Sequence, residues 1–218
     1  MLYIYFFRHG EAVSNLRKET VWGRGTNFKI GLTDFGRRQI RCLAIRVLNE
    51  GIRFNKLYSS PLERCRESIK DLAVINKYPL DEILYEPKLL EKSQGDWEGM
   101  PKSIVYTSDV LEQISNNPDF APPNGESHKD CANRIVNWMN SEIIPMYDLN
   151  KGKDINIGLM AHRMLIQSFY AKINKIDMRE APRINIDNAS LHLFSYHESN
   201  WVVNLTNSIY HLNEGIIN

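Results

Sequence analysis

The sequence contains few of the residues and motifs that build metal centres, disulfide frameworks or nucleotide sites. It has three cysteines in 218 residues, Cys42, Cys65 and Cys131, and their spacing shows no pairing. An odd number of distant cysteines is typical of free thiols in a reducing compartment, not of a disulfide framework or a zinc site. No Walker lysine loop, HExxH or CxxC pattern is present. The sequence therefore indicates no metal ion and no cofactor.

Long apolar runs are also missing. The longest stretches fall well short of the roughly 20 residues that a membrane span needs, and the first residues lack the basic segment of a signal peptide. The formal net charge is +1, which argues against a dedicated nucleic-acid or membrane-surface binder. We therefore expect a cytoplasmic protein without nucleic-acid or membrane partners. The sequence does not indicate its oligomeric state.

The overall composition is that of an ordinary globular protein, with 43% hydrophobic and 24% charged residues. Because no internal repeat, low-complexity tract or Gly/Ser-rich linker is found, a single domain over residues 1–218 is expected. Charge is uneven: residues 1–70 carry 14 Lys and Arg against 6 Asp and Glu. This basic first third fits anion binding, and it fits equally well the solvated face of a helix.

Apolar runs alternate with helical periodicities along the chain, which implies a three-layer α/β/α sandwich with a mostly parallel central sheet. Strands are predicted at Leu2–Phe7, Lys56–Ser59 and Ile155–Ala161, with a C-terminal hairpin at the sheet edge from Ser190–Tyr196 and Trp201–Leu205. Helices are predicted from Thr33 or Asp34 to Gly51, from Pro61 to about Asn76, from Lys102 to about Ser115, from Ser127 to Ile144 and from Met164 to Ile173. Residues 76–125 are otherwise irregular and form the expected lid or specificity insertion.

Histidine and arginine recur where predicted strands end. Arg8 and His9 follow the first strand, Arg64 lies shortly after the second, and His162 and Arg163 follow the third. Ligands bind at the carboxyl ends of strands in open α/β sheets. Arginine forks bind phosphate oxygens bidentately, and a neutral imidazole can attack phosphorus and hold the phosphoryl group covalently. The pattern therefore predicts a phosphate site in which His9 attacks and His162 donates to a phosphate oxygen.

Six segments in this order resemble the histidine phosphatase superfamily, also called phosphoglycerate mutase-like. The segments that carry the resemblance are Arg8-His9-Gly10-Glu11 with Asn15, Leu32-Thr33-Asp34-Phe35-Gly36, Ser59-Ser60-Pro61-Leu62-Glu63-Arg64, Leu90-Glu91 followed by Gly95-Asp96-Trp97-Glu98-Gly99, Gly125-Glu126-Ser127, and Ala161-His162. The resemblance covers most of the chain. It implies the phosphoglycerate mutase-like fold, with His9 and His162 as the two catalytic histidines and Arg8 and Arg64 beside them.

The resemblance also implies an acid that protonates the leaving group, because the family's acid lies in the segment that Glu91 matches. Some branches place an aspartate directly after the second histidine, but Arg163 stands there in this chain. Glu126 is the second choice, and Glu11 is expected to be structural, holding an arginine or a helix end. Asn15 and Gly25, the latter in a loop that resembles the family's phosphate-side loop, are further candidates for binding the phosphate.

Three positions depart from the family's pattern and bear on the substrate. Arg163 replaces the usual glycine, and it either reads a second anionic group or obstructs the phosphate pocket. Asn27 stands where an aspartate is frequent, and Gln167 stands where an arginine is common. The other histidines have no partners at ligand spacing and are interpreted as surface or core residues: His128, His192, His197 and His211.

The function predicted from these residues is hydrolysis of a small phosphate monoester through a phosphohistidine. The alternatives are a bisphosphoglycerate-dependent phosphoglycerate mutase and an inert relative that only binds phosphate esters. Hydrolysis is favoured because the segment between Gly99 and Pro122 is short, whereas the mutases that resemble this chain carry a longer insertion there. The Asp96–Gly99 segment also resembles the phosphatases.

Overall fold

The computed structural model describes residues 1–25, 28–150 and 152–215. In these ranges six strands form one sheet in the order β3-β2-β4-β1-β5-β6. The strands are β1 (Leu2–Arg8), β2 (Lys56–Ser59), β3 (Leu84–Tyr85), β4 (Ile155–Ala161), β5 (Leu191–His197) and β6 (Asn200–Ser208). The first four run parallel, and β5 and β6 form the antiparallel hairpin at one edge. The sheet is therefore mostly parallel, as the sequence predicts.

Helices flank the sheet. They are α1 (Val13–Leu16), α2 (Asp34–Asn49), α3 (Glu63–Ile75), α4 (Lys102–Val105), α5 (Ser108–Asn116), α6 (His128–Trp138), α7 (Ile144–Asp148), α8 (Arg163–Ile173) and α9 (Tyr210–Gly215). Shorter turns are the 3-10 segments η1 (Leu80–Glu82), η2 (Pro87–Leu89), η3 (Gly95–Trp97) and η5 (Ala181–Arg183), and the π-helical η4 (Met139–Ile143). None of the helices in the described ranges is long and apolar enough to traverse a bilayer.

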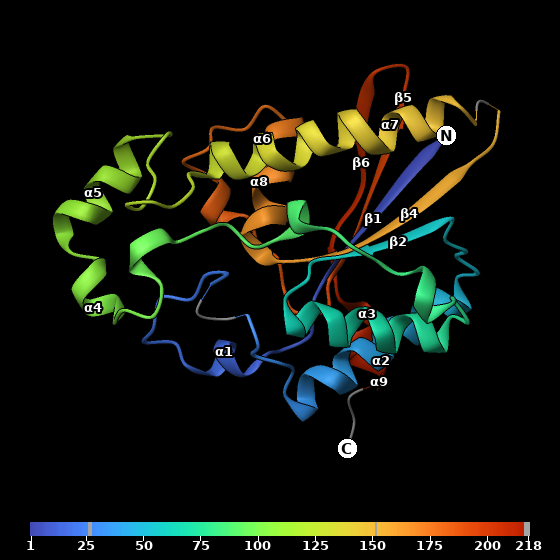
Figure 1. Ribbon diagram of the computed structural model, residues 1–218, viewed down its shortest axis with the longest axis horizontal. Helices are drawn as coiled ribbons and strands as arrows, with labels where there is room; N and C mark the ends of the chain where they lie inside the picture. Colours follow the sequence, from blue (N-terminus) through green and yellow to red (C-terminus); the bar gives the residue numbers. More distant parts are fainter. Residues whose placement is uncertain (26–27, 151, 216–218) are drawn as a thin grey trace.

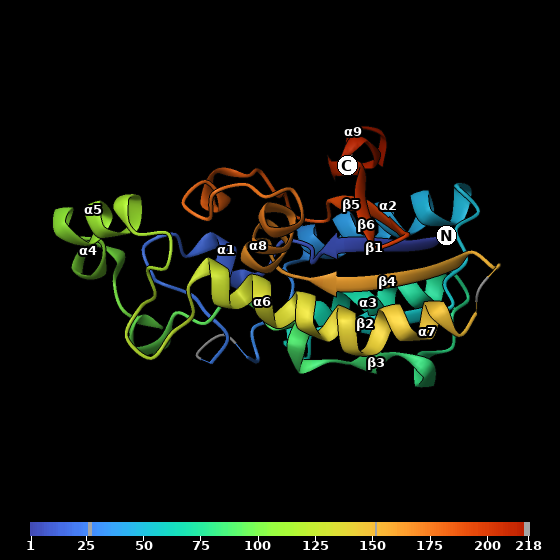
Figure 2. The same ribbon diagram turned by 90° about the horizontal axis from the view of Figure 1, so that it is seen from above.

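Two apolar clusters, one on each face of the sheet, hold three layers together. Successive side chains of β1 point to opposite faces: Phe6 packs with Ile135 of α6 and Phe169 of α8, whereas Phe7 belongs to the cluster of α2 and α3 with Leu43. Figure 1 shows α6 and α7 on one side of the sheet and α2 and α3 on the other, and Figure 2 shows the same layers from above. The predicted α/β/α sandwich is confirmed.

The start of α2 packs against the loop that follows β1. Thr33 is the N-cap, and its hydroxyl accepts a hydrogen bond of 2.9 Å from the Gly36 N–H. A Cβ at Gly36 would collide with the backbone of Glu11, so glycine is required for this approach. The Glu11 carboxylate accepts from the Thr33 hydroxyl at 2.9 Å. Glu11 therefore holds a helix end, as expected, and fixes the loop that carries His9.

Helix α3 begins later than the sequence predicts. Its first residue is Glu63, and Leu62 is the N-cap in an extended conformation with ψ 139°. The Leu62 side chain is fully buried, so burial draws this residue into the core and keeps Pro61 outside the first turn. The shift matters because it sets Arg64 at the start of the helix, close to the strand ends.

The predicted helix from Lys102 to about Ser115 is in fact two helices. Tyr106 leaves the helical conformation at ψ 64°, and the Thr107 hydroxyl caps α5 by accepting from the Val110 N–H at 3.4 Å. A serine or threonine that competes with the helical hydrogen bonds favours such a break. The chain therefore turns at Tyr106, which brings that side chain to the cavity described below.

The predicted helix from Ser127 to Ile144 is interrupted near its end. Ser127 is the N-cap, with a capping box to Asp130, as expected for this start. At the other end the Ile144 N–H donates to the Met139 carbonyl in a π-helical turn, after which α7 continues through Pro145. Because proline has no N–H to donate, a wider turn before it accommodates the missing hydrogen bond.

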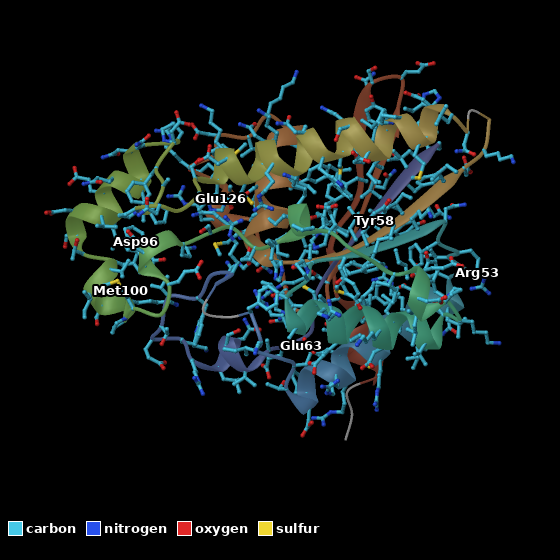
Figure 3. All side chains as sticks on the ribbon, in the orientation of Figure 1. Arg53, Tyr58, Glu63, Asp96, Met100 and Glu126 are labelled. Carbon is cyan, nitrogen blue, oxygen red and sulfur yellow. The ribbon has the colours of Figure 1, made fainter. Side chains whose placement is uncertain are left out.

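Much of the segment at residues 76–125 extends beyond the carboxyl ends of the parallel strands. Figure 3 shows Asp96 and Met100 there, at the opposite end of the molecule from Arg53, and Figure 1 shows α4 and α5 in the same region. The segment is tied to the loop after α1 by backbone hydrogen bonds, such as Lys102 N–H to the Glu19 carbonyl at 2.7 Å. It therefore borders the strand ends at which histidine and arginine residues gather.

Candidate active site

The carboxyl ends of β1 and β4 bring the two predicted catalytic histidines together. These strands are neighbours in parallel register, with Arg8 paired to Ala161, so the next residues, His9 and His162, emerge side by side. The His9 N–H donates to the Ala161 carbonyl at 3.2 Å, and the two imidazole centroids lie 5.3 Å apart.

The hydrogen bonds of His9 fix its tautomer. Its Nδ1 lies 2.7 Å from the carbonyl oxygen of Gly10, and because a carbonyl can only accept, Nδ1 carries the proton. Its Nε2 accepts from Nε of Arg64 at 3.2 Å. Burial, followed by the positive charges of Arg64 and Arg8, holds the pKa of His9 well below its ordinary value. His9 is thus neutral at physiological pH, with a lone pair on Nε2.

His162 is also neutral and fully buried. Its Nε2 lies 2.8 Å from the hydroxyl of Ser60, the residue that follows β2. Burial is the main cause that lowers its pKa, and the charge of Arg64 adds to it. The Cys65 sulfur lies 3.5 Å from the same Nε2, and burial raises the pKa of that thiol to about 12. Cys65 is therefore a protonated thiol beside His162, not a nucleophile.

Arg8 has a buried donor without a partner in the described residues. Its Nη1 donates to the Ile186 carbonyl at 2.6 Å, but its Nε has no hydrogen-bond partner. Burial lowers the pKa of Arg8 to about 10, which still leaves the guanidinium charged near neutral pH. Because buried polar groups are nearly always paired, this N–H is suited to an anionic ligand.

A cavity of about 550 Å³ opens over Arg8, His9 and Arg64. It is lined by one carboxylate, Glu91, and by a set of basic side chains: Arg8, Arg17, Lys18, Arg64, Lys102 and Arg163. The exposed side chain of Arg163 lies at this wall. The cavity is therefore electropositive, and no group of His, Cys, Asp and Glu side chains within the described ranges is arranged to hold a metal ion.

Asn15 lies in the same wall with its amide already oriented. Its Oδ1 accepts from the Ala12 N–H at 2.9 Å and from Nδ2 of Asn188 at 3.3 Å. In both hydrogen bonds the acceptor is Oδ1 of Asn15, so its Nδ2 group can donate to a ligand. Asn188 also donates to the His9 carbonyl at 3.1 Å. The sequence contained no signal that singled out Asn188.

Glu91 is buried beside the second histidine and the first turn of α8. Its Oε1 accepts from the N–H groups of Lys92 at 2.9 Å and Leu165 at 3.2 Å, and the Met164 N–H lies 3.5 Å from Oε2. The N–H groups at the start of α8 thus hold the Glu91 carboxylate at the cavity. Glu91 lines the same cavity as His9, Arg8 and Arg64.

Glu126, the second choice for the acid, is placed differently. Both of its carboxylate oxygens accept from Arg134 at 2.9 Å, and Oε2 also accepts from the Ser93 N–H at 3.0 Å. Burial raises its pKa, but the hydrogen bonds and charge of Arg134 outweigh this and hold the pKa below its ordinary value. Glu126 is therefore suited to a structural ion pair and not to donating a proton.

Gly25 is not brought together with the other phosphate-binding candidates. Its N–H donates to the Glu98 carboxylate at 2.6 Å, and the neighbouring Arg24 N–H donates to the same carboxylate at 3.0 Å. These donors are occupied, so we leave Gly25 out of the phosphate site proposed below. Asn27 lies outside the described residues.

Two residues that the sequence left without a defined role also line this cavity. Gln167 stands where arginine is common in the family, and its amide donates to the Ile184 carbonyl at 2.7 Å, so it supports a loop.

His128 was interpreted as a surface or core residue, and it is half-buried at the cavity wall, with Nδ1 2.8 Å from the Ser168 hydroxyl. Burial lowers the pKa of His128 to about 3, so this imidazole is uncharged near neutral pH. The sequence places His128 at the start of a helix but does not show that this helix end faces the cavity.

The remaining histidines lie away from the cavity. His192 is fully buried in β5, His197 is exposed at the end of that strand, and His211 in α9 is buried with Nε2 3.1 Å from the Ala189 carbonyl. These placements agree with the prediction that they are core or surface residues.

Comparisons with solved structures show the fold. The Bacillus stearothermophilus protein YhfR superposes with a TM-score of 0.80 at 20% identity, covering 97% of this chain and 100% of that chain. A phosphoserine phosphatase mutant from Entamoeba histolytica, in complex with phosphoserine, superposes with a TM-score of 0.78 at 20% identity and the same coverage.

Sequence comparisons give relatives with other names. A phosphoglycerate mutase of Schizosaccharomyces pombe is 30% identical over 142 residues, which span 63% of this chain and 65% of that protein. The 2,3-bisphosphoglycerate-dependent phosphoglycerate mutase 2 of Gloeobacter violaceus is 24% identical over 191 residues, 86% of this chain and 82% of that protein. A family model matches residues 4–209 and is that of the histidine phosphatase superfamily, branch 1. With this match over nearly its whole length, the chain belongs to the histidine phosphatase superfamily.

Proposed function

We propose that this protein hydrolyses a small phosphate monoester through a covalent phosphohistidine on His9. The observation that carries the proposal is the lone pair of His9 Nε2. The Gly10 carbonyl fixes the proton on Nδ1, and Arg64 touches Nε2 at 3.2 Å. A neutral nucleophile is therefore held in contact with a cation that binds phosphate oxygens well.

The phosphate group would lie among Arg8, Arg64, His162 and the Asn15 amide. Both arginines are buried and charged, so little water competes for their donors. The unpaired Nε of Arg8 would gain a partner when the phosphate binds. His162 would donate from a ring nitrogen to a phosphate oxygen, and Arg163 would add positive charge at the rim.

The reaction would proceed in two balanced steps. Nε2 of His9 attacks phosphorus while the ester P–O bond breaks, and the leaving oxygen takes the bonding electron pair and a proton from Glu91. Water then attacks phosphorus and gives a proton back to the Glu91 carboxylate. The P–N bond breaks, which releases inorganic phosphate and regenerates the neutral imidazole.

Hydrolysis and phosphoryl return to a second hydroxyl share this first step. The relatives are named as mutases and the structural neighbours as phosphatases, and the basic cavity wall would also suit a substrate with two anionic groups. We favour hydrolysis because the cavity wall includes the exposed residues Lys102, Arg163 and Pro182, so water would reach the phosphoenzyme. In this proposal residues 76–125 act as a specificity insertion and not as a sealed lid.

Rapid quench with a phosphorus-labelled ester tests the proposal. We expect a phosphoprotein that is labile in acid and stable in base, present in the wild type and absent in His9→Ala. His197→Ala, which changes an exposed histidine outside the cavity, is the matched control and should keep the label. Undiminished phosphate release by a folded His9→Ala protein would contradict the assignment.

A further inference from the structure

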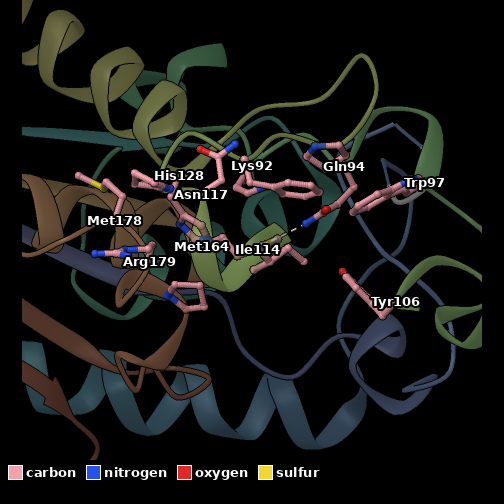
Figure 4. Close-up of a pocket in the computed structure, with 14 residues that line it drawn as sticks. Lys92, Gln94, Trp97, Tyr106, Ile114, Asn117, His128, Met164, Met178 and Arg179 are labelled. Carbon is pink, nitrogen blue, oxygen red and sulfur yellow. Dashed lines mark hydrogen bonds between the residues drawn. The ribbon is translucent and has the colours of Figure 1, made fainter. Parts of the chain in front are cut away.

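A second cavity of about 240 Å³ adjoins the one over His9. We call it the apolar annex and define it by Trp97, Tyr106, Ile114, Phe120, Met164 and Met178. The two cavities have several wall residues in common: Gln94, Tyr106, His128, Met164 and Pro182. The annex is therefore a side chamber of the proposed active site. Figure 4 shows its walls, with Trp97 and Tyr106 on one side and Met178 on the other.

Aromatic rings form one wall of the annex. Trp97 meets Tyr106 edge to face at a centroid distance of 5.8 Å, and it meets Phe120 at 5.8 Å with the rings tilted by 34°. Such a wall is well suited to a flat apolar group, because aromatic contacts add stabilisation beyond the burial of area. Ile114 of α5 lines the same chamber, so residues 76–125 supply most of the apolar side chains that define the annex.

The charged groups at the annex are occupied by other partners. Lys92 Nζ donates to the Glu126 carbonyl at 2.6 Å, and burial lowers the pKa of Lys92. Arg179 is bound to Asp177 with an N–O distance of 2.6 Å. The annex thus contrasts with the basic cavity beside it: one chamber suits an anion, and the other suits an uncharged group.

The annex begins where the leaving oxygen would be protonated. Met164 lines both chambers, and its N–H lies 3.5 Å from Oε2 of Glu91. A substrate with its phosphorus near His9 and its leaving oxygen at Glu91 would direct the rest of the alcohol past Met164. The position of the proton donor therefore defines which part of the substrate meets the annex.

We propose that the annex binds the alcohol portion of the substrate, and that this portion is an apolar ring system. The inference rests on the proposed function, since it assigns the leaving group of the same reaction. A cavity of roughly 150 Å³ is enough to hold benzene, so this chamber has room for one ring or two fused rings. The substrate class is then the aryl or ring-bearing phosphate monoesters, and not compact esters that carry a second anionic group.

The test compares 1-naphthyl phosphate with methyl phosphate, which cannot reach the annex. Because naphtholate is a better leaving group than methoxide, binding is compared and not rate: we expect calorimetry on His9→Ala, in which turnover is blocked, to show at least tenfold tighter binding of the naphthyl ester. Ile114→Asp, which adds a charge to the annex wall, should weaken naphthyl phosphate binding about tenfold and leave methyl phosphate unaffected. Leu111→Asp is the matched control on α5, because Leu111 is exposed and outside the annex.

The outcomes separate this inference from the proposed function. Equal binding of both esters, or equal loss in Ile114→Asp and Leu111→Asp, would overturn the annex as the leaving-group site even if both esters are hydrolysed. Absence of turnover for both esters would count against hydrolysis, while a preference for naphthyl phosphate in the calorimetry would still support the annex.

Discussion

Nε of Arg64 donates to Nε2 of His9 over 3.2 Å, so the candidate nucleophile and a candidate phosphate ligand are in contact before any substrate binds. Arg64 lies in the first turn of α3, and His9 follows β1. Both side chains are buried. Burial, with the positive charge of Arg64 added to it, keeps the imidazole neutral. The contact also requires the guanidinium to turn toward phosphate oxygens when the reaction begins.

Replacing Arg64 should affect both rate and titration. We expect Arg64→Met to lower kcat/KM at least hundredfold, which is typical when one charged transition-state contact is lost. The pKa of His9 should rise toward its ordinary value, because one of the two nearby cations is gone. NMR titration of the His9 ring in the free protein measures this shift. An unchanged pKa would mean that burial alone keeps His9 neutral.

Replacing Glu91 should affect esters according to their leaving group. Glu91→Gln keeps an oxygen that can accept from the Leu165 N–H, but it cannot donate a carboxyl proton. We expect kcat/KM, which reports formation of the phosphoenzyme, to fall about 10² to 10⁴-fold for alkyl phosphates and far less for p-nitrophenyl phosphate, because p-nitrophenolate leaves without protonation. Glu126→Gln is the control, and it should leave the ratio of the two rates unchanged. A change in the ratio for Glu126→Gln alone would reverse the assignment.

Buried His192 should make folding stability depend on pH. The Asn207 N–H donates to its Nδ1 at 3.0 Å, so protonation of Nδ1 would break this bond. Burial lowers its pKa to about 3 in the folded state, against about 6.5 when unfolded. The unfolded chain therefore binds the extra proton, and stability falls as pH drops from about 6.5 toward 3, by roughly 1.4 kcal/mol per pH unit for this group.

Denaturant unfolding at several pH values checks this prediction. His192→Asn retains an acceptor near the position of Nδ1 and cannot titrate, so its stability should fall less steeply with decreasing pH. His197→Asn changes an exposed histidine of the same strand and should keep the wild-type slope. If His192→Asn and the wild type have the same slope, His192 is not the group responsible.

The sequence predicted the parts of the fold that depend on local patterns. The apolar runs became β1, β2 and β4 with nearly the expected bounds, and Thr33 caps α2 as expected. The boundaries that failed depend on tertiary contacts. Burial of Leu62 delays α3, and the break at Tyr106 places that side chain in the cavity wall. Neither effect can be detected in the hydrophobic periodicity of the segment.

The candidate site divides in the same way. His9 and His162 could be found because each directly follows a strand. Ser60 also follows a predicted strand and lies in a segment that carries the family resemblance, but its bond of 2.8 Å to His162 joins distant parts of the sequence. Asn188 follows no predicted strand, and its role also arises from contacts that are distant in the sequence, such as the bond of 3.1 Å to the His9 carbonyl. Gly25 could not be assessed from the sequence for another reason: the loop that resembles the family's phosphate loop donates its N–H groups to Glu98 in this structure, and the periodicity of the chain does not reveal that contact.

Arg163 should act through its charge at the cavity rim. Its side chain is exposed and lines the cavity, which favours anion recognition over obstruction. We expect Arg163→Gly to lower kcat/KM several-fold at low ionic strength, with a larger loss for an ester that carries a second anionic group, and we expect the difference to shrink as salt is added. Arg163→Ala controls for the flexibility of glycine. Faster turnover of every ester by both variants would instead show that Arg163 obstructs the pocket.

The last prediction separates hydrolysis from phosphoryl transfer between hydroxyls and from binding without turnover. Arginine side chains supply the positive charge around the proposed phosphate, so p-nitrophenyl phosphate should be hydrolysed without added metal and with little loss in a chelator. A mutase needs a pocket that excludes water until the intermediate reorients, whereas exposed Lys102 and Arg163 line this cavity. We therefore expect negligible interconversion of 3- and 2-phosphoglycerate, assayed with and without 2,3-bisphosphoglycerate. Fast bisphosphoglycerate-dependent interconversion with weak hydrolysis would identify a mutase, and tight binding of esters without turnover of any would identify an inert relative.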